Sequence, residues 1–70
     1  MAEKRFKPGD RVAWTHSQGR STGKVVRRLT YPTKIGRHAV AAAPEKPEYL
    51  VESDTTGARA AHRPGALKPL

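Results

Sequence analysis

The chain has 70 residues, contains no cysteine, and carries 14 Lys and Arg against 6 Asp and Glu, which gives a formal net charge of +8. This length allows one domain near the lower size limit for a fold without staples, and the lack of cysteine excludes a disulfide framework and a thiolate metal site. The positive charge favours polyanionic partners, nucleic acid above all.

Residues 1–5 are polar and predict a flexible tail ahead of a single domain over residues 6–70. No apolar run is long enough to span a membrane, and the N-terminus lacks the hydrophobic stretch of a signal peptide. We therefore expect a cytoplasmic monomer with no membrane partner.

The segment Phe6–Trp14 combines a turn with the start of a strand. A proline–glycine–aspartate turn precedes the predicted strand Arg11–His16, in which alternation places Val12 and Trp14 on one face. A tight turn followed by an alternating strand is typical of small SH3-like barrels, which bind ligands and rarely catalyse reactions.

Turn signals divide the rest of the chain at short intervals. Ser21–Leu29 is rich in β-branched residues and predicts a strand, in which Gly23 indicates a bulge or bend. Further strands are expected at Lys34–Ala43, Tyr49–Ser53 and Ala58–His62, with a hairpin turn at Asp54–Gly57 and a closing turn at Arg63–Leu67. The prediction is an all-β, SH3-like barrel of about five strands. Its largely buried side chains are expected to be Val12, Trp14, Val25, Val40, Val51 and Leu67.

The chain resembles the bacterial hypervirulence-associated Tudor-domain family. The resemblance is carried in order by Phe6–Trp14, Gly23–Val26, Tyr49–Asp54 and Ala60–Leu67. It implies a Tudor-like barrel, and it implies little about activity, because the family's name records an association with virulence rather than a mechanism.

The polar residues do not form a pattern that predicts catalysis or metal binding. His16, His38 and His62 are far apart and lack the short spacing of metal ligands. Glu52 and Asp54 could share a strand face, where a role in offsetting neighbouring cations is favoured over acid–base chemistry. We therefore expect no enzyme activity, no metal site and no cofactor.

Tudor-like barrels can carry aromatic cages that hold methylated ammonium groups. The aromatic side chains here are Phe6, Trp14, Tyr31 and Tyr49, and the first two are expected in the core. The remaining two tyrosines are too few to predict a cage.

A basic cluster surrounds Tyr31 and gives the leading functional hypothesis. Cations that meet phosphates around an aromatic ring that stacks on a base are typical of single-stranded nucleic-acid binding. The candidate nucleic-acid-binding residues are Lys24, Arg27, Arg28, Tyr31, Lys34 and Arg37.

In a regular strand, Lys24 and Arg28 face one side and Arg27 the other, so only a bulge or a bend could bring the three together. The sequence leaves open two alternatives: a solvated basic face without a ligand, and a protein-interaction module that takes a peptide at a sheet edge or loop groove.

Overall fold

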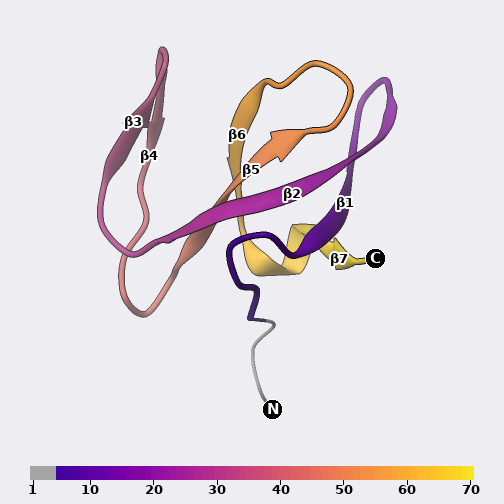
Figure 1. The fold of residues 1–70 in the computed structure, drawn as a ribbon. Helices are drawn as coiled ribbons and strands as arrows, with labels where there is room; N and C mark the ends of the chain where they lie inside the picture. Colours follow the sequence, from indigo (N-terminus) through magenta and orange to yellow (C-terminus); the bar gives the residue numbers. More distant parts are fainter. Residues whose placement is uncertain (1–4) are drawn as a thin grey trace.

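A computed structural model describes residues 5–70, and it is built of antiparallel strands with one short 3-10 turn (Figure 1). Apart from Arg5, the tail expected over residues 1–5 lies outside the described residues. Nowhere between residues 5 and 70 is there a helix of the length and apolarity that a membrane crossing needs. The elements are β1 (Arg11–His16), β2 (Gly19–Leu29), β3 (Thr33–Ile35), β4 (His38–Val40), β5 (Glu48–Ser53), β6 (Arg59–His62), η1 (Pro64–Ala66) and β7 (Lys68–Pro69).

Five strands form one antiparallel sheet in the order β6-β5-β2-β1-β7, while β3 and β4 pair separately as a hairpin. The long β2 lies at the centre and pairs with β1 through its first half and with β5 through its second. From β6, at one edge of the sheet, η1 carries the chain to β7, at the other edge beside β1 (Figure 1). The predicted all-β, SH3-like barrel is confirmed.

The structure differs from the sequence-based expectation mainly in the number of strands. The segment Lys34–Ala43, expected as one strand, contains the turn between β3 and β4 and all of β4. Gly36 has a φ of +59° in this turn, which reverses the chain, so a continuous strand could not form. The two-residue β7 was not expected, because its pairing depends on contact with β1 and not on a local pattern.

A buried cluster fills the barrel interior on one face of the sheet. Val12, Val25, Val51 and Leu67 are almost completely buried there together with Trp14. The six core positions expected from the sequence, including Val40 in a second cluster, are all buried. The burial pattern therefore confirms the predicted core.

The remaining two core aromatics lie against each other at one end of the same cluster. The rings of Phe6 and Tyr49 pack edge to face with centroids 5.3 Å apart. The Phe6 backbone N–H donates a hydrogen bond to the Tyr49 hydroxyl at 3.3 Å, which satisfies a polar group that would otherwise be buried without a partner. This contact attaches the chain ahead of β1 to β5.

A β-bulge at Val26 interrupts the pairing of β2 with β5. Val25 lies opposite Val51 and Arg27 opposite Leu50, so Val26 is the extra residue. A bulge was expected near Gly23, and it occurs three residues later. Beyond it the alternation of β2 is reversed, and Leu29 turns away from the barrel interior toward Leu50.

The reversed alternation creates a second apolar cluster on the outer face of the sheet. Leu29, Leu50, Val40 and Ala42 are buried together, with Val26, Ile35 and Ala61 packed against them. The cluster attaches the β3–β4 hairpin, which extends from the end of β2 remote from β1 (Figure 1).

Gly23 is the point where β2 is paired on both sides, with Val12 of β1 and Ser53 of β5. A Cβ atom at this position would lie 2.0 Å from the Glu52 carbonyl oxygen and 2.9 Å from the Trp14 ring. Both distances are far below van der Waals contact, and the first neighbour is backbone. Gly23 is therefore required for close packing rather than for the bulge predicted there.

We expect Gly23→Ala to destabilise the fold by about 2 kcal/mol or more, because the added methyl group must displace backbone or the core tryptophan. Urea unfolding followed by Trp14 fluorescence measures the change. Gly65→Ala is the matched control, since a Cβ there meets nothing within 4 Å. Equal stability of the two variants would contradict the assignment.

His62 on β6 packs against Trp14 with ring centroids 5.4 Å apart. Its Nε2 atom is buried and has no hydrogen-bond partner among the described residues. Burial lowers the pKa of His62 below its ordinary 6.5, and the negative charge of Glu48 partly offsets this effect. The fold therefore favours the neutral imidazole.

The lowered pKa of His62 predicts acid sensitivity with a definite sign. The unfolded chain binds this proton at about pH 6.5, so the free energy of unfolding should fall as the pH drops from there to the lower folded-state pKa, and this contribution should be constant above pH 6.5. Urea titrations across this range measure it. His62→Phe should remove this component, whereas the exposed His38→Gln should retain it.

Candidate functional site

An open groove of about 490 Å³ lies between the β3–β4 hairpin and the outer face of the sheet. Its floor is apolar and consists of Val26, Ile35 and Leu50. Three cations line the same groove, and each comes from a different strand: Arg27 from β2, Lys34 from β3 and Arg59 from β6. Thr33 completes the lining.

The bulge gives β2 two side chains in this groove. At a bulge, two successive residues lie opposite one partner residue, and here Val26 and Arg27 both lie at Leu50. Val26 contributes to the floor while Arg27 contributes to the cationic margin. One local irregularity thus places an apolar and a charged side chain of the same strand in one site.

Glu52 links two cations on the same face of the sheet. Its carboxylate lies 3.5 Å from Arg59 Nε and 4.0 Å from Lys24 Nζ. All three side chains are partly exposed, so water screens both ion pairs, and each contributes little to stability. The pairs orient the two cations and partly offset their positive charge.

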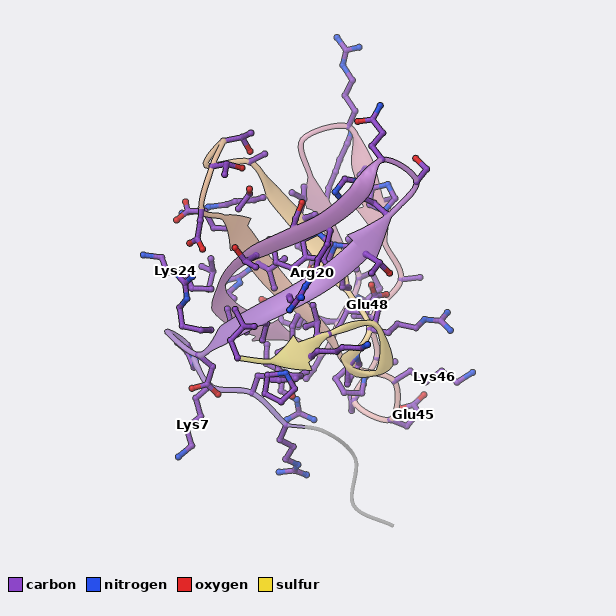
Figure 2. The ribbon with its side chains drawn as sticks, turned by 90° about the vertical axis from the view of Figure 1, so that its right-hand side faces the viewer. Lys7, Arg20, Lys24, Glu45, Lys46 and Glu48 are labelled. Atoms are coloured by element: carbon purple, nitrogen blue, oxygen red, sulfur yellow. The ribbon has the colours of Figure 1, made fainter. Side chains whose placement is uncertain are left out.

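The structure brings together only part of the predicted basic cluster. Arg27 and Lys34 line the groove, and Lys24 lies on the same face through its pair with Glu52. Arg28 lies opposite Tyr49 and therefore on the other face of β2, because directly opposed residues in antiparallel strands share a face. Figure 2 shows Lys24 projecting from the side of the molecule remote from Lys46.

The two remaining predicted residues flank the hairpin. Tyr31 is 57% exposed in the connection from β2 to β3, where its carbonyl oxygen accepts a hydrogen bond from the Thr33 hydroxyl at 3.0 Å. Arg37 is exposed in the turn between β3 and β4 and is not among the groove-lining residues.

Arg59 is the groove cation that sequence reasoning missed. It lies far along the chain from the other cations and faces Glu52 across the β5–β6 hairpin. The sequence did contain a signal for this position. The correctly predicted turn at Asp54–Gly57 sets the register of β5 against β6, which places Arg59 opposite Glu52.

An aromatic cage does not form in the part of the chain that the structure describes. Phe6, Trp14 and Tyr49 are buried in the barrel interior, and the Tyr49 hydroxyl is hydrogen-bonded to backbone. Tyr31 alone among the four aromatic residues is well exposed. One exposed ring cannot surround a methylated ammonium group.

The described residues include one serine–histidine contact, in the β1–β2 hairpin. His16 Nε2 lies 2.9 Å from Ser21 Oγ, while the Gln18 backbone N–H donates to His16 Nδ1 at 3.3 Å. Because Nδ1 accepts a hydrogen bond, the neutral ring carries its proton on Nε2 and donates to the serine. A general base would have to accept the serine proton at that atom, so this pair has the wrong polarity to activate a nucleophile.

The two neighbouring carboxylates, Glu52 and Asp54, are each engaged by cations. Asp54 receives a two-pronged contact from Arg11, at 2.9 Å and 2.5 Å, and a further hydrogen bond from the Thr22 hydroxyl. These contacts join β1, β2 and the β5–β6 turn. Between residues 5 and 70, no cluster of three or more histidine or acidic residues could hold a metal ion.

The bent antiparallel sheet, its small buried core and its open groove define a small barrel-like domain. Residues 9–67 match the family model of the Tudor domain of hypervirulence-associated proteins, and the chain belongs to this family. Tudor domains are in general small, non-catalytic binding modules. Neither the curated proteins nor the solved structures contain a significant match to this chain.

Proposed function

We propose that this protein is a non-catalytic module that binds nucleic acid weakly and without sequence preference through the groove beside the β3–β4 hairpin. The observation that carries the proposal is the gathering of Arg27, Lys34 and Arg59 from three strands around one groove. Lys24 extends the same basic face, and the whole chain has a net charge of +8.

This arrangement suits a polyanion. Long cationic side chains that remain exposed can reach phosphates at different spacings, and each contact releases a counterion. Because no rigid set of donors and acceptors lines the groove, base identity has little influence on the binding energy. The expected affinity is therefore that of non-specific binding, with a Kd of about 10⁻⁴–10⁻⁶ M at physiological salt.

The polar contacts support the absence of catalysis in this proposal. The serine–histidine pair has the wrong hydrogen-bond polarity, and the two neighbouring carboxylates are both held by cations. Neither set offers a free nucleophile or base beside the groove.

Peptide binding is the alternative, and one observation favours it. The edge strand β7 pairs with Val12 and Ala13, and the Leu70 backbone N–H donates to the Arg11 carbonyl oxygen, so residues 14–16 of β1 are paired on the β2 side alone. An exposed edge can accept an extended peptide as an added strand. A peptide bound there would leave the groove free, and its binding would depend weakly on salt.

Charge reversal in the groove should weaken nucleic-acid binding for all sequences alike. Arg27→Glu combined with Lys34→Glu should flatten the plot of log K against log salt by about one unit per lost phosphate contact. Fluorescence anisotropy with labelled DNA and RNA over a salt titration measures this slope.

The matched control is Arg28→Glu combined with Lys46→Glu, which changes the net charge equally. Arg28 lies on the opposite face of β2, and Lys46 lies across the molecule from Lys24 (Figure 2). Equal losses in both double variants would show that only total charge matters. If the unmodified protein binds neither DNA nor RNA at low salt, the proposal fails and peptide binding becomes the leading hypothesis.

Removing the carboxylate at Glu52 should have the opposite effect. Glu52→Gln frees Arg59 and Lys24 from their ion pairs and removes a negative charge that repels phosphate. We expect nucleic-acid binding to strengthen by a few-fold and to become more sensitive to salt. Glu45→Gln, in the loop that carries Lys46, is the control (Figure 2). An unchanged affinity for Glu52→Gln would contradict the involvement of this face.

A further inference from the structure

We infer that the groove holds the base of an unstacked nucleotide on its apolar floor, so that the protein prefers single-stranded nucleic acid to duplex. The inference rests on the proposed function and goes beyond it, because phosphate contacts alone would favour the duplex, whose charge density is higher.

The floor is the first observation. Val26 and Ile35 are only partly buried, although they pack against the second apolar cluster together with Leu50. A ligand that offered only phosphates would leave these apolar surfaces in water. A base has a broad face of low polarity, and covering the floor with it gains hydrophobic energy that a phosphate cannot supply.

The arrangement of charge around the floor is the second observation. Arg27, Lys34 and Arg59 come from three different strands and line the same groove as the apolar surface. A nucleotide combines a flat apolar group with an anionic backbone, which matches an apolar floor with a cationic margin. The groove volume of about 490 Å³ lies within the range of roughly 300–1,000 Å³ typical of small-ligand sites.

Tyr31 supplies a second surface for stacking beside the groove. Its ring is exposed, and it lies two residues before Thr33, which lines the groove. The Thr33 hydroxyl donates a hydrogen bond to the Tyr31 carbonyl oxygen, which links the two residues within this connection. An adjacent base of the same strand can therefore stack on the tyrosine ring.

A duplex cannot use either surface. Its bases are paired and stacked inside the helix, so only the outer backbone meets the protein. The groove cations would still attract duplex phosphates, while the floor and the tyrosine ring would contribute nothing. The preference for a single strand should therefore come from base contacts and not from charge.

The test compares three probes of about 12 nucleotides at one low salt concentration: oligothymidylate, an abasic strand with the same backbone, and a duplex. Fluorescence anisotropy gives the three dissociation constants. We expect oligothymidylate to bind at least about fivefold tighter than the abasic strand, because each base that stacks adds affinity at constant charge. We expect the duplex to bind more weakly than oligothymidylate, although its charge density is higher.

Two variants locate the base contacts. Tyr31→Ala should lose at least about fivefold in affinity for oligothymidylate and nothing for the abasic strand, whereas Tyr31→Phe should retain the affinity. Val26→Thr, which makes the floor more polar at similar size, should likewise weaken only the probe that has bases. The Trp14 fluorescence of each variant confirms that it is folded.

Equal binding of oligothymidylate and the abasic strand would overturn this inference and leave the proposed function intact. Tighter binding of the duplex than of oligothymidylate would overturn this inference as well. The absence of binding to all three probes would overturn the proposed function itself. An acidic peptide that competed with oligothymidylate at equal concentration would assign the groove to a protein partner. That result would overturn both this inference and the proposed function.

Discussion

One unpaired residue in the central strand determines how the two faces of the sheet are used. The bulge at Val26 reverses the alternation of β2, so Arg27 and Leu29 face outward instead of into the barrel. In a regular strand both would enter the interior, where an unpaired arginine is costly to bury. The second apolar cluster, the attachment of the hairpin and the cationic groove all depend on this single insertion.

Small size limits what the aromatic residues of this chain can do. A domain of 70 residues buries a thin core, and here Phe6, Trp14 and Tyr49 are used to fill it. With three of its four aromatic residues in the core, the domain has too few exposed rings left for a cage. The exposed chemistry of this chain is instead cationic, which suits the recognition of anions rather than of methylated ammonium groups.

Much of the barrel could be predicted from sequence because its signals are local. Alternating residues indicate β1, a short apolar run indicates β5, and glycine or proline marks most of the turns. The bulge at Val26 has no such mark, since neither glycine nor proline lies there, and the register of β2 against β5 creates it. The register of β2 against β5 determines which face each basic residue occupies. Sequence alone therefore could not tell which of Arg27 and Arg28 shares a face with Lys24.

The groove was less predictable than the barrel for the same reason. Arg27, Lys34 and Arg59 become neighbours only when the hairpin packs onto the outer face of the sheet. The proposed roles of Tyr31 and Arg37 in binding are still predictions, because the structure shows where these residues lie and not what they contact in a complex.

The barrel and the hairpin rest on different apolar clusters, one on each face of the sheet. Sequence change in the hairpin therefore has little effect on the packing that holds the barrel together. Selection can alter the length and chemistry of this arm at small risk to folding, and an engineer can exchange it as a unit. Members of one barrel family could in this way acquire different ligands while their common scaffold stays the same.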